Sequence, residues 1–489
     1  MRMAKSQTKQ GNAQSRFQYL RLADAMEEEI KKGVYRTGEK LPAIRTLHAQ
    51  AGVSITTVCQ AYGELENRGL VEPRPKSGYY VKPRLHNILP LPTVRPHRAR
   101  PEKVQVNVLA ETMQETISNQ SMLPLGTAVP SPDLLPLKQL ASSARTVAAR
   151  YLKNNNIGYG SPGGLPALRR QIAKRMVGCG VQCNEEDIII TNGCMEAITL
   201  CLRAIAKPGD TVLVESPTFV CYLQLIEDLN MMALEIPTDP EQGIDLAALS
   251  EALAEHEAHA CILNPNFQNP LGFEMPTANK KKLLNILAER NIPIIEDDIY
   301  GELYFGSTRP PLMKSFDAKG LVLYCSSFSK DLAPDLRVGW TIPGQFTNRV
   351  QRLKFNSTIS SSKLNQMVME DFLANGHFDR HLRRMRSAIQ NRLVTIARMI
   401  GEYFPAGTKI TAPQGGYILW VQLDDKVDGF ELFHRAKQEN ISILPGEICS
   451  STSGYKNCIR ISCCHPWSAE LEEGIKKLAE LITDLAEKE

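Results

Sequence analysis

Residues 325–340, with the sequence CSSFSKDLAPDLRVGW, place a lysine beside hydroxyl side chains and seven residues before an arginine. The lysine is Lys330, and the hydroxyl groups are those of Ser327 and Ser329. A lysine amine captures a carbonyl group when burial or a neighbouring cation favours its neutral form. Hydroxyl groups and the guanidinium of Arg337 are suited to binding phosphate. The stretch therefore indicates a site for a ligand that carries both an aldehyde and a phosphate group.

Five short apolar runs of four to six residues end in polar or aromatic residues: DIIITNG, DTVLVESP, ACILNPN, IPIIEDDIY and GLVLYCSS. Such runs, alternating with longer helical patterns, predict the buried parallel strands of an α/β sheet. Because these sheets bind ligands at the carboxyl ends of their strands, the residues after the runs are expected to meet in one site. Those residues are Gly193, Cys194 and Met195 after the first run, Phe219 after the second, Asn269 after the third, Asp297 and Tyr300 after the fourth, and Ser327, Ser329 and Lys330 after the fifth.

Pyridoxal 5'-phosphate is a cofactor whose needs this set matches. Asp297 can keep the pyridinium nitrogen protonated, so that the ring acts as an electron sink. Asn269 and Tyr300 can hold the phenolic oxygen, and Phe219 can stack on the ring. The amides of a helix that starts after TNG can join the serines and Arg337 at the phosphate. Each residue alone also has a structural explanation, such as a helix cap or a core position, but their joint order favours the cofactor site.

The N-terminal part of the chain has a different pattern. Apolar residues recur every fourth position in LRLADAMEEEIKKG, and two further helical segments follow, KLPAIRTLHAQAG and ITTVCQAYGELENRG. The next segment, LVEPRPKSGYYV, has two β-prone runs around a Pro/Gly turn, which predicts a hairpin. This order of elements predicts a winged helix-turn-helix, whose last helix enters the major groove of DNA.

Small polar side chains on that helix and basic side chains around it are the expected DNA contacts. The set is Arg45, Ser54, Thr56, Thr57, Gln60, Arg74 and Lys76. The basic members would neutralise phosphates, while the polar members reach the groove. Ser54 is also a plausible N-cap of the helix. A three-helix protein-interaction module with a basic rim is the alternative that the pattern alone leaves open.

Composition divides the chain into a winged helix-turn-helix domain at 14–83, a basic, proline-rich linker at 84–120 and an α/β domain at 121–489. Residues 1–103 hold 19 Lys and Arg against 9 Asp and Glu, whereas the whole chain has a net charge of +4. A basic front suits a phosphate backbone. Five prolines and six basic residues at 82–103 predict an extended tether.

Three absences bound the function further. No apolar run is long enough to span a membrane, and the N-terminus lacks the pattern of a signal peptide. No CxxC pair occurs among the twelve cysteines, so a metal site is not expected. The sequence therefore predicts a cytoplasmic protein without a membrane partner.

The N-terminal motifs LPAIRTL, GVSITTV, AYGELENRGLV and SGYYV resemble the DNA-binding domain of GntR-type bacterial regulators. That resemblance implies a double-stranded DNA operator as a partner. Ile55 departs from the family pattern, which usually has a basic residue after the serine of GVS.

From about residue 121 onward the chain resembles the fold-type I, class I aminotransferases. The motifs are IGYGSPGGLPALRRQIA, ITNGCMEAI, VESPTFVCY, NPNFQNPLG, IIEDDIYGEL, SSFSKDLAPDLRVGW, PQGGYILWV and CIRIS. The resemblance implies that Lys330 forms the internal aldimine with pyridoxal phosphate and that Arg460 binds a substrate α-carboxylate. It also implies that Tyr159 reaches a phosphate in the partner subunit, and hence a homodimer. Cys194 and Met195 depart from the small polar residues that usually follow TNG.

The two resemblances joined in one chain are those of the MocR-type transcriptional regulators. They imply an α/β fold-type I aminotransferase-like domain behind an N-terminal winged helix-turn-helix. The expected function is a bacterial DNA-binding regulator that senses an amino acid, an amine or pyridoxal phosphate through the lysine aldimine. The alternative is an active class I aminotransferase, converting an amino acid to a 2-oxo acid, that carries a DNA-binding domain. A cofactor-dependent scaffold without DNA binding is a third interpretation.

Overall fold

The computed structural model describes residues 7–36, 38–74, 77–81, 85, 88–94, 97–107, 111, 121–153, 157–452 and 454–487. The chain divides into two compact units, of which the smaller comprises residues 1–87 with 305–309 and the larger comprises 88–304 with 310–489. Among the described helices, none has both the length and the apolar character that crossing a membrane requires.

The smaller unit consists of three helices and a hairpin. Its elements are α1 (Gln7–Lys31), α2 (Ile44–Ala51), α3 (Ile55–Asn67), β1 (Val71–Arg74) and β2 (Gly78–Val81), and β1 pairs antiparallel with β2. The apolar stripes predicted from the sequence form its core, in which Met26 of α1 and Val58, Tyr62 and Leu65 of α3 are buried. The arrangement is the winged helix-turn-helix that the sequence predicts.

Two local signals fix where α3 begins. Gly52 ends α2 in the left-handed conformation with φ 63°, a conformation that glycine adopts without strain. Ser54 then caps α3, because its hydroxyl accepts a hydrogen bond from the backbone amide of Thr57 at 3.1 Å. The turn between α2 and α3 therefore spans only residues 52–54.

The larger unit is built on a nine-stranded sheet with the order β3-β7-β6-β9-β10-β11-β12-β5, to which β8 adds by pairing with β7. Its strands are β3 (Pro101–Lys103), β5 (Ile189–Thr191), β6 (Thr211–Ser216), β7 (Met232–Asp239), β8 (Gly243–Ile244), β9 (Ala260–Leu263), β10 (Ile294–Asp297), β11 (Val322–Ser327) and β12 (Gly339–Ile342). The central strands β7, β6, β9, β10 and β11 run parallel, whereas β12 runs antiparallel to β11. The predicted parallel sheet of buried strands is confirmed.

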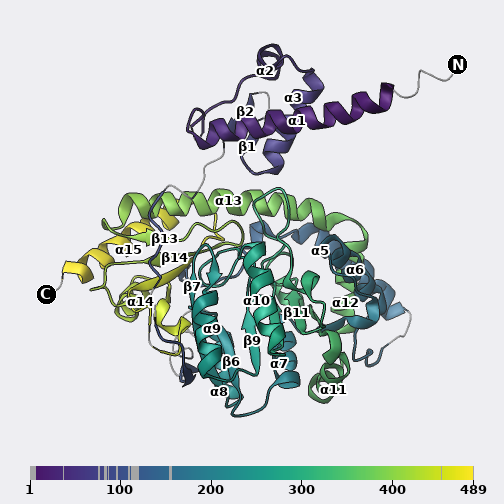
Figure 1. Cartoon of the computed structure of the whole chain (residues 1–489), viewed down its shortest axis with the longest axis vertical. Helices are drawn as coiled ribbons and strands as arrows, with labels where there is room; N and C mark the ends of the chain where they lie inside the picture. The colour runs from purple at the N-terminus through teal and green to yellow at the C-terminus, as the bar shows by residue number, and fades with distance from the viewer. Residues whose placement is uncertain are drawn as a thin grey trace. The chain divides into compact units, whose positions relative to one another are not determined.

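Helices enclose this sheet (Figure 1). They are α5 (Leu137–Lys153), α6 (Pro166–Gly178), α7 (Cys194–Ile205), α8 (Val220–Asp228), α9 (Leu246–Glu255), α10 (Thr277–Glu289), α11 (Thr347–Thr358), α12 (Lys363–Ala374) and the long α13 (His377–Tyr403). Buried residues of α7 and α8 pack on one face of the sheet, against side chains of β6, β9, β10 and β11. Both helices begin at the carboxyl end of a strand, so their first residues point toward the same edge.

The C-terminal part of the larger unit adds a smaller sheet with the order β13-β14-β17-β16. Its strands are β13 (Lys409–Ile410), β14 (Ile418–Gln422), β16 (Leu444–Pro445) and β17 (Cys458–Ser462), and α14 (Gly429–Gln438) and α15 (Ala469–Glu487) accompany them (Figure 1). A short parallel pair, β4 (Leu123–Pro124) with β15 (Ile441–Ser442), joins the start of this unit to its C-terminal part.

Part of the segment predicted as an extended tether packs on the larger unit. Strand β3 pairs antiparallel with β7, and Val104 and Val106 beyond it are buried. Before it, the amide of Thr93 donates to the side-chain oxygen of Gln422 at 2.8 Å. An edge strand tolerates a proline at its first residue, as at Pro101 of β3, which is why proline and basic content did not reveal this contact. Residues 84, 86–87, 95–96, 108–110 and 112–120 of the predicted linker lie outside the described residues.

Candidate cofactor-binding site

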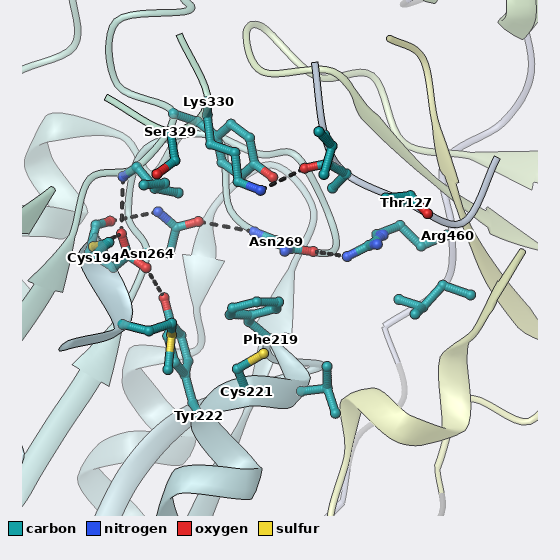
Figure 2. Close-up of a pocket in the computed structure, with 18 of the residues that line it drawn as sticks. Thr127, Cys194, Phe219, Cys221, Tyr222, Asn264, Asn269, Ser329, Lys330 and Arg460 are labelled. Carbon is teal, nitrogen blue, oxygen red and sulfur yellow. Dashed lines mark hydrogen bonds between the residues drawn. The ribbon is translucent and has the colours of Figure 1, made fainter. Parts of the chain in front are cut away.

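A cavity of about 450 Å³ opens where the strand ends of the large sheet meet the smaller sheet. Its walls come from the loop at 126–129, the start of α7, residues 219–224 with α8, the ends of β9, β10 and β11, and the segments that carry Leu444, Ile448 and Arg460. Figure 2 shows how side chains from these distant parts of the sequence converge on one space. The predicted site residues Cys194, Met195, Phe219, Asn269, Asp297, Tyr300, Ser327, Ser329, Lys330, Arg337 and Arg460 all line the cavity.

Lys330 follows β11, and its amine reaches across the cavity. The Nζ atom donates a hydrogen bond to the backbone oxygen of Ala128 at 2.6 Å (Figure 2). Burial lowers the pKa of Lys330 to about 8, and the nearby Arg460 guanidinium acts in the same direction. Near pH 8 about half of the amine is therefore neutral and nucleophilic, as capture of an aldehyde requires.

Asp297 is the last residue of β10, and its carboxylate accepts three hydrogen bonds. The hydroxyl of Tyr222 donates to Oδ2 at 2.5 Å, the thiol of Cys194 donates to Oδ1 at 3.4 Å, and the amide of Ile299 donates to Oδ1 at 3.0 Å. Burial raises the pKa of Asp297 to about 6, while these donors stabilise the ionised form. The carboxylate is therefore charged at neutral pH and can pair with a protonated ring nitrogen.

A buried hydroxyl group in the cavity wall needs a partner. The Oη atom of Tyr300 is buried, and its contact with the hydroxyl of Tyr417 lacks the geometry of a hydrogen bond. Beside it, Oδ1 of Asn269 accepts a hydrogen bond from Arg460 at 2.9 Å. The carbonyl oxygen of Asn269 therefore already has a partner within the protein. An unpaired buried donor costs stability unless a ligand satisfies it. Tyr300 therefore fits the predicted role of binding the phenolic oxygen of pyridoxal phosphate.

The predicted phosphate-binding residues gather at the start of α7. Arg337 donates to the hydroxyl of Ser329 at 3.4 Å and to the backbone oxygen of Asn192 at 3.2 Å. Gly193 has φ +85°, and a Cβ atom there would collide with the Arg337 guanidinium. The close approach of this cation to the first amides of a helix creates a site with two independent attractions for an anion.

Cys194 and Met195 lie in the expected phosphate region, but their side chains are not directed to bind a phosphate. The thiol of Cys194 points to Asp297. Met195 is half-buried and packs against the core beside the sheet. Only the backbone amides of this turn are available to an anion, in agreement with the departure from small polar residues seen in the sequence.

Arg460, on β17, is a buried cation whose hydrogen-bond partners are neutral. Its side chain is 4% exposed and donates to Asn269 and, through Nη2, to the backbone oxygen of Gly126 at 2.6 Å. Its Nε atom forms no hydrogen bond with the described residues. A buried charge without a counter-charge is unfavourable, so this guanidinium fits an anionic group of a ligand.

Phe219 and Tyr159 occupy different environments. Phe219 lines the cavity and meets the ring of Tyr222 edge-on, with a centroid distance of 5.4 Å. Tyr159 is 86% exposed and is not among the residues that line the cavity of its own chain. Its predicted role toward a phosphate in a partner subunit stays a prediction.

Sequence reasoning missed two side chains that support the site. Tyr222 comes three residues after Phe219, and on a helix this spacing places the two side chains next to each other on the same face. Asn264 donates to the backbone oxygen of Asp297 at 2.6 Å and accepts from the amide of Asn269 at 3.0 Å. The helical spacing after the aromatic residue was the available signal for Tyr222, whereas Asn264 is recognisable only once the strands are adjacent.

The predicted DNA-facing residues of the smaller unit divide into two groups. Ser54, Thr56 and Gln60 are exposed, as is Arg45 on α2. Thr57 is 4% exposed, and its hydroxyl lies 2.8 Å from that of Ser54. The placement of Thr57 on the DNA-facing side is therefore corrected: this position belongs to the helix cap and the core.

One of the two predicted phosphate contacts of the hairpin, Arg74, belongs to the described residues. Arg74, at the end of β1, lies over the ring of Tyr80 at 4.1 Å and forms an ion pair with Glu72 at 3.2 Å. Lys76 lies outside the described residues. The exposed thiol of Cys59 joins the outward face of α3, a position that the sequence prediction did not include.

Comparison with known proteins agrees with this division. Residues 124–478 match the family of class I and II aminotransferases, and residues 18–81 match the bacterial regulatory proteins of the gntR family. Two Escherichia coli K12 proteins named as uncharacterised helix-turn-helix transcriptional regulators are similar along nearly their whole length. YjiR is 39% identical over 95% of this chain and 98% of its own, and YdcR is 37% identical over 95% and 99%.

Solved aminotransferases resemble the larger unit in fold. Kynurenine aminotransferase of Pyrococcus horikoshii matches with a TM-score of 0.73 and 27% identity, over 79% of this chain and 96% of that enzyme. The α-aminoadipate aminotransferase LysN of Thermus thermophilus matches with a TM-score of 0.71 and 28% identity, over 78% and 96%. The enzymes cover the larger unit, whereas the two E. coli proteins cover both units. Because both units and their order in the chain are shared with the latter, this chain belongs to the MocR-type regulators, in which a GntR winged helix-turn-helix precedes an aminotransferase-like domain.

Proposed function

We propose that this protein is a pyridoxal phosphate-dependent, DNA-binding transcriptional regulator whose larger unit senses an amino acid, an amine or the cofactor itself. The observation that carries the proposal is Lys330, a partly buried lysine that lines the same cavity as Asp297 and Arg460, in the same chain as a winged helix-turn-helix. Such a lysine is suited to holding an aldehyde, and the winged helix is suited to holding DNA. The two units are then the sensor and the output of one molecule.

The residues of the cavity divide the work of binding. Asp297 would hold a proton on the ring nitrogen, Tyr300 would donate to the phenolic oxygen, and Arg337 with the amides of α7 would bind the phosphate, since all three side chains line the cavity. When bound, pyridoxal phosphate supplies an aldehyde that exchanges between Lys330 and the amine of an effector. Arg460 holds the carboxylate of an amino acid beside this exchange.

Sensing requires that the ligand bind more tightly in one arrangement of the protein than in another. Lys330 is suited to starting such a change, because its amine donates a hydrogen bond to Ala128 in the loop at 126–129. This contact belongs to the free amine, so an effector that would take the place of Lys330 at the aldehyde would release the amine to the loop. We assign the loop as the first part of the larger unit to respond.

The proposal is tested with the full-length protein in two linked measurements. Duplexes are first selected from a random DNA pool, and their affinity is then measured with and without pyridoxal phosphate and a panel of amino acids and amines. A change in affinity of about tenfold, within the usual range of allosteric coupling, is the expected result. DNA affinity that is independent of all these ligands would reject sensing.

Absorbance spectra distinguish the sensor from an active enzyme. In a sensor, the band of the lysine-bound cofactor shifts with an amino acid and then persists. If the band decays to that of pyridoxamine phosphate and returns with a 2-oxo acid, the protein is a working aminotransferase with a DNA-binding unit. Lys330 in its neutral form would then also move the proton at the substrate α-carbon.

Two variants assign the units separately. Lys330→Ala is expected to abolish the absorbance band while leaving DNA binding without effector intact. Arg45→Ala, on exposed α2, is expected to weaken DNA binding while leaving the band intact. The reverse pattern would overturn the assignment of the two units.

A further inference from the structure

The turn that leads into α7 is held from two sides at Asn192. Its backbone oxygen accepts a hydrogen bond from Nη2 of Arg337 at 3.2 Å, and its backbone amide donates to Oε2 of Glu196 at 2.6 Å. The side-chain amide of Asn192 also donates to Oε1 of Glu196, at 3.3 Å. Glu196 therefore fixes the residue against which the guanidinium of Arg337 is placed.

Glu196 carries its carboxylate in the first turn of α7. This is the helix end whose amides and dipole are expected to attract the phosphate of the cofactor. An uncompensated carboxylate there would repel the phosphate, because like charges interact strongly where water is excluded. The site therefore needs a cation that cancels this charge and leaves Arg337 to the phosphate.

Lys354 of α11 supplies that cation. Its side chain is fully buried, and Nζ donates to Oε2 of Glu196 at 2.7 Å and to the hydroxyl of Ser361 at 3.0 Å. Burial lowers the pKa of Lys354, while the Glu196 carboxylate opposes this shift. Removing one partner of a buried ion pair leaves an uncompensated charge, which is strongly unfavourable. The two residues therefore act as a unit.

A hydroxyl group of α11 completes the set of donors, because Thr358 donates to Oε1 of Glu196 at 3.0 Å. Each oxygen of this carboxylate thus accepts one hydrogen bond from Asn192 and one from α11. Glu196, Lys354 and Thr358 are not among the residues that line the cavity, whereas Arg337 is. An effect of the ion pair on a ligand therefore passes through Asn192 and Arg337.

We infer that Glu196 and Lys354 form a positioning pair for the phosphate of pyridoxal phosphate. Glu196 holds Asn192 in the place from which its backbone oxygen orients Arg337. Lys354 cancels the charge that Glu196 would otherwise present to the phosphate. The inference rests on the proposed binding of the phosphate by Arg337 and the start of α7, and it adds the residues behind the cavity wall that make this binding favourable.

The test compares pyridoxal phosphate with pyridoxal, which has the same ring and aldehyde but lacks the phosphate. Cofactor-free, full-length protein is titrated with each, and the absorbance band of the lysine-bound ligand measures the affinity. Lys354→Met should weaken pyridoxal phosphate about tenfold or more, the effect of one lost interaction with a charged group, and leave pyridoxal nearly unchanged. A purely structural role would weaken both ligands alike, and that result, or no loss at all, would overturn the inference.

A double variant separates charge from packing. Glu196→Gln combined with Lys354→Met removes both charges and keeps a side-chain oxygen that can accept from the amide of Asn192. This protein should recover most of the affinity for pyridoxal phosphate that Lys354→Met alone loses. If the double variant binds as weakly as the single one, the charge of Glu196 is not what Lys354 compensates, and the inference is wrong.

Lys314→Met is the matched control. Lys314 pairs with Asp317 at 3.0 Å, and Asp317 in turn accepts hydrogen bonds from the backbone amides of Leu321 and Val322. This pair has the same construction as that of Lys354, but its members do not line the cavity and lie at the amino end of β11. The control should keep the original ratio of the two affinities. A ratio that falls as far as in Lys354→Met would contradict a specific role of Lys354.

A milder variant decides the question if Lys354→Met does not fold. Thr358 is exposed, so Thr358→Val removes one donor to Glu196 without disturbing the core. We expect a loss of about threefold for pyridoxal phosphate, in the range of one ordinary hydrogen bond, and none for pyridoxal. Equal affinities in Thr358→Val and the unaltered protein would argue against the role of the Glu196 carboxylate.

The two proposals fail in different ways. If the unaltered protein binds pyridoxal as tightly as pyridoxal phosphate, the proposed phosphate site at Arg337 and α7 is wrong, and the positioning pair falls with it. If the unaltered protein prefers pyridoxal phosphate and Lys354→Met keeps that preference, the proposed site stands and Glu196 with Lys354 only stabilises the fold.

Discussion

At the scale of single residues, the candidate site consists of ionisable groups whose surroundings move them toward useful protonation states. Burial brings the pKa of Lys330 down to about 8 and that of Asp297 up to about 6. Between these values the aspartate is ionised while part of the lysine is neutral. Neutral pH is therefore the range in which one residue can hold a ring proton and the other can attack an aldehyde.

The lowered pKa of Lys330 predicts a pH profile for cofactor capture. The rate at which cofactor-free protein takes up pyridoxal phosphate should rise with pH and level off above a midpoint of about 8, because the neutral amine is the nucleophile. Stopped-flow absorbance measures this rate, and Lys330→Ala should give none of it. A rate that continues to rise past pH ~10, as for an ordinary lysine, would contradict the assigned burial.

The hydroxyl of Tyr222 predicts a second pH effect. Tyr222→Phe removes a donor to ionised Asp297, so the pKa of this carboxyl should rise from about 6 by roughly one to two units, the effect of one hydrogen bond to a charged group. Because the ring nitrogen needs the ionised form, cofactor affinity falls as the pH is lowered, and in the variant this fall should begin at a higher pH. Cofactor binding measured from about pH 5 to 9, a range that spans both pKa values, tests this expectation.

Tyr324→Phe is the matched control for that substitution. Tyr324 donates to Asp298 at 2.9 Å, is equally buried, and does not belong to the residues that line the cavity. The control should keep the original pH profile. If both variants shift the profile alike, the effect is one of general destabilisation and not of the contact between Tyr222 and Asp297.

At the scale of elements, α3 presents one face to the core and the opposite face outward. Val58 and Tyr62 are buried, whereas Thr56, Cys59 and Gln60 are exposed. No lysine or arginine occurs in Ile55–Asn67, so basic contacts to phosphate must come from other elements such as α2. The face of α3 is therefore suited to contacts with base edges more than with the backbone of DNA.

Gln60 predicts a loss of DNA affinity that depends on sequence. A glutamine can bind adenine through two hydrogen bonds in the major groove, so Gln60→Ala should cost about 1–3 kcal/mol on the selected duplex and little on random DNA. Fluorescence anisotropy with both duplexes measures the difference. Gln50→Ala, an exposed glutamine of α2, is the control, and an equal loss in that variant would argue against readout by α3.

At the scale of the whole molecule, Tyr159 predicts that a complete site needs two subunits. Its side chain is 86% exposed and absent from the cavity of its own chain, although the motif that contains it implies a phosphate contact. We therefore predict that Tyr159 acts on the site of another copy. A homodimer would then be the unit that binds cofactor and spans two DNA half-sites.

Mixing inactive subunits tests this arrangement. Tyr159→Ala and Lys330→Ala homodimers should each bind cofactor poorly, because every site in them lacks one residue. After unfolding and refolding together, the mixed dimer has one site with both residues and should recover up to half of the lysine-bound absorbance of its population. No recovery in dimers verified by sedimentation would place Tyr159 outside the site of the partner.

The sequence by itself determined the two domain types, the order of the strands' polar ends and many of the residues that line the cavity. These are local signals. They are the periodicity of helices and strands, and motifs such as SSFSKDLAPDLRVGW, in which the spacing of polar residues after an apolar run indicates where the strand ends. Asp297 and Lys330 could be identified because they lie at the end of β10 and just after β11, and Arg337 because it follows Lys330 by seven residues.

Only the tertiary structure decided contacts between segments that are distant in the chain. The thiol of Cys194 turns to Asp297, Thr57 turns into the core, and the proline-rich segment at 101–103 completes the edge of a sheet. Each outcome depends on which segment packs beside the residue in question. That segment is determined by the packing of the whole unit and not by the local sequence. The cavity is decided in the same way, because its lining comes from a loop, the starts of helices and later segments that meet only in the folded protein.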